Sequence, residues 1–184
     1  MPNWCNNNIT VTHTDPAVIL KLVDSINEGK FFDHICPVPT ELMETTSGFF
    51  GDDERQTELV KRQMSNTVKY GYKDWYDFCT SEWGTKWDAG QADLDILDDN
   101  TISLCFDTAW SPPIELYNKM MEQGYSVEAY YYEPGMAFVG HYEDGDDECY
   151  EIPGNSNEVV ERIPKYLDEM FAISESMEQW EEDE

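Results

Sequence analysis

The order in which strand-like and helix-like patterns follow one another is the strongest constraint on the fold of this chain. Alternating apolar and polar residues indicate strands, and apolar residues that recur every three or four positions indicate helices. In chain order these patterns are a strand at 6–14, a helix at 16–27, strands at 87–97 and 101–107, a helix at 111–124 and a strand at 126–132. The order β-α-β-β-α-β predicts an α+β, ferredoxin-like split βαβ fold, an antiparallel sheet with helices on one face.

Both helices of this pattern begin with residues that favour helix N-termini. Asp15 offers an N-cap oxygen directly before Pro16, and Ser111 is the expected cap before the two prolines at 112–113. Gly124 then supplies the C-terminal stop of the second helix. These local signals place the helix boundaries.

Other segments add to this pattern. Residues 31–72 are interrupted by proline and glycine, so they predict a long insertion after the first helix, with a short helix at 54–65. Another helix is expected at 73–83, and residues 136–142 continue the sheet. Apolar residues at helical spacing over 159–180 predict an added C-terminal helix.

The chain is long enough for one buried core with an appendage. At 184 residues, with 40% hydrophobic and 14% aromatic side chains, it folds despite a net charge of −28. We expect a ferredoxin-like domain at 1–142, which includes the insertion, and an appendage at 143–184. The appendage would consist of an acidic loop, the C-terminal helix and an acidic tail.

The negative charge is concentrated in the second half of the chain. Residues 1–92 carry a net charge of −6, whereas residues 93–184 carry −22. Two runs stand out, Glu143–Glu148 and Glu178–Glu184. Because affinity for phosphates comes mostly from Lys and Arg, we expect no direct nucleic-acid binding.

Several classes of protein are not indicated. No run approaches the roughly 18 apolar residues of a membrane span, and the first residues lack the regions of a secretory signal, so we expect a cytoplasmic protein with no membrane partner. The five cysteines are scattered without a Cys-x-x-Cys pair, and the three histidines never stand at ligand spacing. We therefore expect no disulfide framework, no metal and no cofactor.

Two tryptophan-centred segments carry chemistry that the fold pattern does not explain. They are WGTKWDA at 83–89 and FDTAWSPP at 106–113. Indoles repeated beside a lone lysine and carboxylates suggest either a ligand or catalytic pocket, or a packed junction in which the lysine neutralises the acids. No nucleophile–base pair, phosphate loop or metal motif accompanies them, so we favour the junction. The pocket candidates are Trp83, Lys86, Trp87, Asp88, Asp107, Trp110 and Glu133.

Four separated motifs resemble those of a known family. They are MPNWCNN at 1–7, WGTKWD at 83–88, FDTAWSPP at 106–113 and EPGMAFVG at 133–140. Together they resemble the YubB ferredoxin-like domain family over residues 1–142. The resemblance implies a small α+β protein of bacterial plasmids and phages, of no established biochemical role, whose family offers no catalytic residues to carry over. The acidic segment after Gly140, the following helix and the tail depart from the family pattern.

Three functional hypotheses remain. The first is a non-enzymatic phage-type or mobile-element protein that binds a host protein with a basic surface in the host cytoplasm, as a counter-defence or host-takeover factor imitating the charge of nucleic acid. The second is a small-molecule-binding or catalytic protein that uses the Trp/Lys/Asp residues. The third is that the acidity serves solubility alone. The acidic surface of the first hypothesis comprises Glu143, Asp144, Asp146, Asp147, Glu148, Glu181, Glu182, Asp183 and Glu184.

Overall fold

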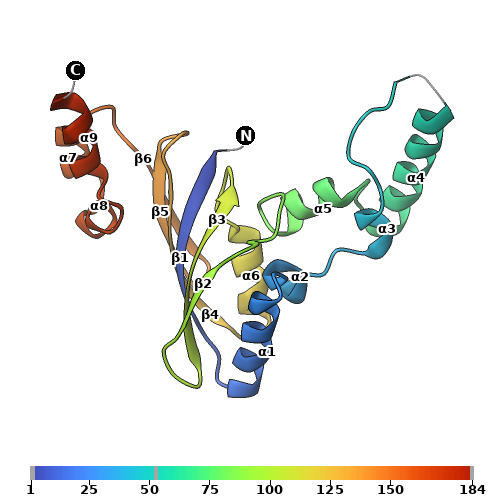
Figure 1. Ribbon diagram of the computed structural model, residues 1–184, viewed down its shortest axis with the longest axis horizontal. Coiled ribbons are helices and arrows are strands. Elements are labelled where there is room, and N and C mark those ends of the chain that lie inside the picture. Colours follow the sequence, from blue (N-terminus) through green and yellow to red (C-terminus); the bar gives the residue numbers. More distant parts are fainter. Residues whose placement is uncertain (1–2, 52–53, 183–184) are drawn as a thin grey trace.

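A six-stranded antiparallel sheet forms the centre of the protein in a computed structural model that describes residues 3–51 and 54–182 (Figure 1). The strand order is β2-β3-β1-β4-β5-β6. The strands are β1 (Trp4–Thr12), β2 (Asp93–Ile96), β3 (Thr101–Ala109), β4 (Ser126–Glu133), β5 (Phe138–Glu143) and β6 (Asp146–Glu151). The first four strands, with one helix after β1 and one after β3, form the predicted ferredoxin-like unit.

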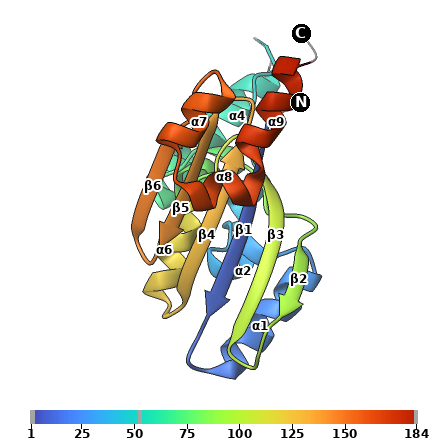
Figure 2. The same cartoon turned by 90° about the vertical axis from the view of Figure 1, so that its left-hand side faces the viewer.

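Helices cover both faces of this sheet. Helices α1, α2 and α6 pack on one face, and α7, α8 and α9 lie on the other, over β4 and β5 (Figures 1 and 2). The helices are α1 (Pro16–Asn27), α2 (Phe31–Ile35), α3 (Thr40–Met43), α4 (Glu54–Tyr70), α5 (Trp75–Glu82), α6 (Ile114–Glu122), α7 (Ser156–Arg162), α8 (Lys165–Phe171) and α9 (Ile173–Glu182). None of the helices in the described ranges combines the length and the apolar character that crossing a bilayer requires.

The two expected helix N-termini have different outcomes. At α1 the prediction is confirmed, because Asp15 accepts a hydrogen bond from the Ala17 N–H at 2.9 Å and Pro16 occupies the first turn. At α6 the expected cap is wrong. The Ser111 hydroxyl donates instead to the carbonyl oxygen of Gly84 at 2.6 Å, and α6 begins after the two prolines without a side-chain cap.

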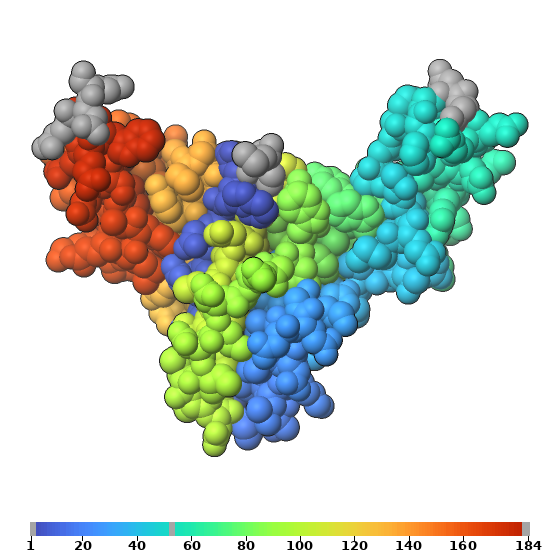
Figure 3. All heavy atoms as spheres, in the orientation of Figure 1, coloured from blue at the N-terminus to red at the C-terminus, as the bar shows by residue number. Residues whose placement is uncertain are grey.

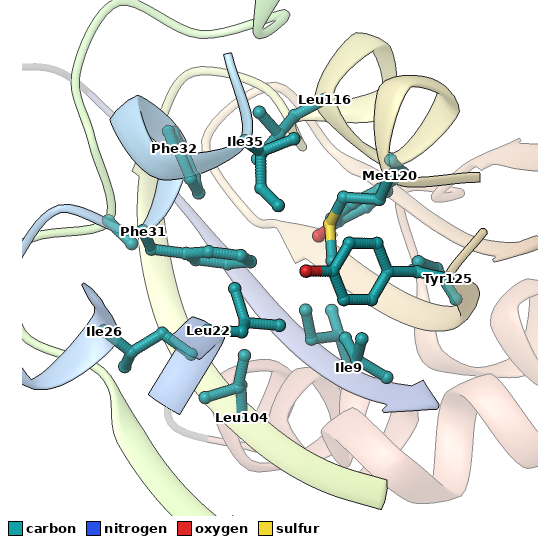
Figure 4. Packing of buried hydrophobic residues seen from close by; sticks show 14 of the residues in the cluster. Ile9, Leu22, Ile26, Phe31, Phe32, Ile35, Leu104, Leu116, Met120 and Tyr125 are labelled. Atoms are coloured by element: carbon teal, nitrogen blue, oxygen red, sulfur yellow. The ribbon is translucent and has the colours of Figure 1, made fainter. Parts of the chain in front are cut away.

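The main core lies between the sheet and α1, α2 and α6 (Figure 4). Phe31 and Phe32 of α2 are fully buried in it, and each meets the ring of Phe106 edge to face. Both phenylalanines belong to the segment expected as an insertion, so the first turn of that segment is part of the core. The residues labelled in Figure 4 are Ile9, Leu22, Ile26, Phe31, Phe32, Ile35, Leu104, Leu116, Met120 and Tyr125.

The rest of the insertion projects from the body as an arm made of α3 and α4 (Figure 3). The helix expected at 54–65 continues to Tyr70. Asn66 anchors α4, because its side-chain amide donates to the Thr45 hydroxyl at 2.9 Å and to the Lys73 carbonyl at 3.0 Å.

The C-terminal segment differs most from the prediction. The single helix expected over 159–180 is three helices, since the chain breaks at Pro164 and again at Ala172, whose φ is +49°. Their buried residues form a second core on the far face of the sheet. The acidic segment expected as a loop forms a hairpin, in which β6 pairs with β5 and becomes an edge of the sheet.

Tyr131 of β4 packs across Gly140 of β5, its directly paired residue. The ring is buried, and its hydroxyl donates to Asp147 of β6 at 2.8 Å. A Cβ atom at Gly140 would lie well inside 3.0 Å of this ring, a separation that real Cβ atoms essentially always exceed. The glycine is therefore required by the close approach of the tyrosine.

Candidate functional site

Trp83 belongs to a packed junction between α5 and α6. Its side chain is buried, and its indole N–H donates to the carbonyl oxygen of Cys36 at 2.9 Å. Thr85 is also buried and donates to the Ala109 carbonyl at 3.0 Å. Between them, Gly84 has a φ of +84°, which turns the chain where backbone atoms of residues 112–115 approach closely. Trp83 therefore has a structural role.

Asp88 and Glu133 also organise backbone. Asp88 accepts hydrogen bonds from the N–H groups of Phe32, Asp33 and Ala89 at 2.7–3.1 Å, and thereby holds the start of α2. Burial raises the pKa of Asp88, although these three donors oppose the rise. Glu133 is fully buried and accepts from the N–H groups of residues 135 and 136 in the β4–β5 turn. Both carboxylates are thus occupied by backbone N–H groups.

Trp4, Trp87 and Trp110 form an exposed cluster, which we call the tryptophan row. Between 39% and 48% of each of these residues is exposed. The Lys86 ammonium lies 3.7 Å from the ring centroid of Trp87 and 4.0 Å from that of Trp110, and the Trp4 and Trp87 centroids are 6.3 Å apart. Lys86 forms no ion pair with any described residue, so its charge is stabilised by the two indoles.

The backbone of Trp110 is held in an unusual conformation. Its φ of +70° lies in the left-handed region, which a bulky residue rarely adopts. Its N–H donates to the carbonyl oxygen of Asn3 at 3.0 Å, which extends the β1–β3 pairing by one residue. The strained backbone fixes the indole at the edge of the row.

A hollow of about 400 Å³, which we call the Trp4 hollow, opens on the polar face of β1, β2 and β3. Asp107 lies in it, and its Oδ1 accepts from the side-chain amide of Asn6 at 3.2 Å. Its lining residues are Trp4, Asn6, Ala89, Gln91, Asp93, Cys105, Phe106 and Asp107. The structure thus separates the expected pocket group into a buried junction, an exposed indole row and this hollow.

The exposed carboxylates at 143–148 lie along the β5–β6 hairpin and the edge strand. Three of them also have internal partners. Asp144 accepts from the Ser126 hydroxyl and the Val127 N–H at 2.9 Å, and Asp147 accepts from the Tyr131 hydroxyl. Glu148 accepts from the Tyr150 hydroxyl at 3.0 Å. The other two expected carboxylates of this segment, Glu143 and Asp146, are exposed.

The C-terminal acidic run is only partly described. Glu181 accepts from the N–H of Ser156 at 2.9 Å and from its hydroxyl at 2.8 Å, and so ties α9 to α7. Glu182 ends α9, and Asp183 and Glu184 lie outside the described residues.

Comparison with known proteins assigns the fold and a family. A family model described as the ferredoxin-like domain in Api92-like protein matches residues 77–178. The chain belongs to this family. The assignment supports the fold expected from the resemblance, but the name given there, YubB, is not confirmed. The matched range runs past Tyr142, so the β5–β6 hairpin and most of the C-terminal helices belong to the Api92-like domain.

One solved structure is similar to this Api92-like chain. It is the crystal structure of a protein api92 from Yersinia pseudotuberculosis, with 13% sequence identity and a TM-score of 0.46. The similarity covers 84% of this chain and 99% of that chain. The search of curated proteins finds no match.

Two exposed tryptophans of the Api92-like chain were missed as site residues. Trp4 stands in the first motif of the sequence, before the strand expected at 6–14, and no charged side chain beside it suggested a site. Trp180 is 79% exposed and borders a hollow of about 550 Å³ with Tyr132, Ile173 and Met177. Its helical spacing predicted only a helix face, and nothing local signalled an exposed ring. Among the described residues, no three His, Cys, Asp or Glu side chains gather as a metal site.

Proposed function

We propose that this chain is a non-enzymatic binding protein whose acidic face receives a basic surface of another protein. The acidic face comprises the polar side of β1, β2 and β3 together with the adjoining helix α9. The observation that carries the proposal is that exposed carboxylates surround exposed indoles on this face. Such a combination offers electrostatic steering together with large rings for the centre of an interface.

The charge of this face is almost uncompensated. From residue 87 to the end, the chain contains three basic residues. Lys119 pairs with Glu82 at 2.5 Å, and the other two form exposed pairs one helical turn apart in α7 and α8. No basic residue stands in β1, β2, β3 or α9. Apart from Lys86, which lies against Trp87 and Trp110, a basic partner would therefore meet few competing cations.

The apolar part of the face consists of rings that the fold leaves uncovered. Trp180 projects beside one hollow and Trp4 beside the other. Tryptophan is enriched among the residues that dominate interface energies, whereas rim charges mainly set association rates. The proposal therefore predicts affinity from the indoles and salt sensitivity from the carboxylates. The proposal includes a host protein as the partner and counter-defence by nucleic-acid mimicry as the role. These two parts rest on charge alone.

Charge reversal tests this proposal. The variant Glu175→Lys/Glu178→Lys changes two exposed carboxylates of α9, and Asp24→Lys/Glu122→Lys makes the same change on helices of the opposite face. Both variants have the same net charge. Partners captured from a host lysate by chemical cross-linking at low salt should be lost with the first variant and retained with the second. Cross-linking carried out at about 0.5 M salt should capture far less of them, because salt screens the attraction before the covalent link forms. Equal capture by both variants would refute binding through the acidic face.

A second candidate function is favoured by the position of Lys86 between two exposed indoles. A small planar molecule that displaced the ammonium would stack between Trp87 and Trp110. A thermal-shift screen of nucleotides and metabolites tests this alternative. A ligand whose shift is unchanged by Lys86→Ala does not use the space between these rings.

A further inference from the structure

The Trp4 hollow combines an exposed ring with carboxylates that have spare acceptor capacity. One oxygen of Asp107 accepts from Asn6, and Asp107 has no other hydrogen bond or ion pair with the described residues. The Asp93 side chain has none with them. Trp4 is 48% exposed at the rim. The hollow thus presents acceptors and an aromatic face to solvent.

The strand register places the two carboxylates at a useful separation. Asp93 pairs directly with Cys105, which is two residues before Asp107 on the same side of β3. Diagonal neighbours of this kind lie about 7–8 Å apart between Cα atoms, within reach of one shared ligand. The surroundings are electrostatically negative: burial raises the pKa of the Cys105 thiol, and Asp93 and Asp95 raise it further.

These features select one kind of occupant. Asp93 and Asp107 have no ion pair with the described residues, and carboxylates in this state repel phosphates and favour a positive group. A ring face beside carboxylates suits a planar cation that stacks and donates several hydrogen bonds in fixed directions, which describes guanidinium better than ammonium. The chain already contains one cation–ring contact of this kind, because the Lys86 ammonium lies over the neighbouring indole of Trp87.

We infer that the Trp4 hollow binds the guanidinium of an arginine side chain presented by the protein partner. The inference rests on the function proposed above, because it names the group by which the basic partner would be recognised. In the Trp4 hollow, the guanidinium stacks on Trp4 and donates hydrogen bonds to Asp107 and Asp93. The arginine would be the anchor at this end of the acidic face.

The experiment uses a capped arginine, N-acetyl-arginine methylamide, as the probe, with the full chain labelled with nitrogen-15. Indole N–H resonances report on Trp4 and Trp87 during the titration. The matched controls are capped citrulline, which has nearly the same shape without the charge, and capped lysine. We expect saturable shifts of the Trp4 resonance with arginine, at least about threefold weaker binding of lysine, and no saturation with citrulline.

Two variants locate the site. Asp107→Asn conserves the shape of the side chain and should weaken arginine binding about threefold to tenfold. The matched control is Asp95→Asn, which lies two residues after Asp93 on the same face of β2 and should change arginine binding less than twofold. Trp4→Ala should weaken binding similarly, with Trp87 as the remaining reporter. Unchanged backbone spectra away from the hollow show that each variant is folded.

The outcomes separate the two proposals. Equal shifts with citrulline and arginine, or an Asp107→Asn variant that binds arginine as well as the parent, would overturn the arginine site. If arginine binds as expected but α9 charge reversal leaves partner capture intact, the site stands and the acidic-face function fails. If capture is lost on charge reversal but the hollow does not distinguish arginine from citrulline, the acidic-face function stands and the arginine site fails.

Discussion

Replacing Gly140 by alanine should strongly destabilise the fold. The new Cβ would overlap the buried ring of Tyr131, and overpacking of this kind destabilises by about 1–3 kcal/mol. A ring displaced to relieve the overlap loses its hydrogen bond to Asp147, which contributes about 1.5–3 kcal/mol for a charged acceptor. Removing the flexible glycine offsets about 0.5–1 kcal/mol. The expected net loss is about 3 kcal/mol.

Urea unfolding followed by circular dichroism measures this loss. With a slope of about 2 kcal/mol per molar urea, the midpoint should fall by about 1.5 M with little change in slope. Gly154→Ala is the matched control, because nothing lies within 4 Å of a Cβ there, and its midpoint should move by less than about 0.3 M. In a Tyr131→Leu background the Gly140→Ala change should become much smaller, since the ring is gone. A Gly140→Ala midpoint equal to that of the parent would refute the steric reasoning.

Three further predictions concern Trp83, Asp88 and Glu82. Trp83→Phe leaves the partly buried Cys36 carbonyl without its donor and should lower the free energy of unfolding by about 1–3 kcal/mol in the same urea assay; an unchanged midpoint would contradict this. Asp88→Ala removes the acceptor for three N–H groups and should lower it by about 2–4 kcal/mol, whereas an effect below about 0.5 kcal/mol would show that water replaces the carboxylate. Burial disfavours the charged form of Glu82, but hydrogen bonds from Lys119 and Tyr72 outweigh it and lower the pKa of Glu82. The stability that charged Glu82 contributes to the fold is therefore present above the usual glutamate pKa and is lost as pH falls through the pKa of the folded state. The stability difference between the parent and Glu82→Gln, measured by urea unfolding, should therefore shrink below about pH 4.5, and a difference that grows on acidification would contradict the assigned sign.

Elements with local signals were predictable from the sequence. Helix α1 was predicted with its observed bounds because Asp15 and Pro16 mark its start and its apolar stripe faces one core. The C-terminal helices were predicted as one because Pro164 breaks a helical spacing that continues on both sides of it. Strand β6 was read as a loop because an edge strand that is exposed on most positions needs no alternation of apolar residues.

The candidate site was harder to predict, since burial depends on long-range packing. Trp83 and Trp87 stand in one motif, four residues apart, yet one is buried and the other exposed. Gly84 turns the chain between them, and its left-handed φ has no signature beyond the glycine itself. Trp4 joins the same surface from the other end of the chain, because β1 pairs with β3. Only the sheet register brings these indoles together.

The acidic edge strand β6 also has a colloidal consequence. An open strand edge offers unpaired N–H and C=O groups to any other strand, and two copies could in principle join their sheets through it. Exposed carboxylates at 146–148 and at Glu151 place like charges opposite one another in every such pairing. Low salt therefore keeps the copies apart, and high salt, which screens the repulsion between these carboxylates, lowers the barrier to growth of a shared sheet.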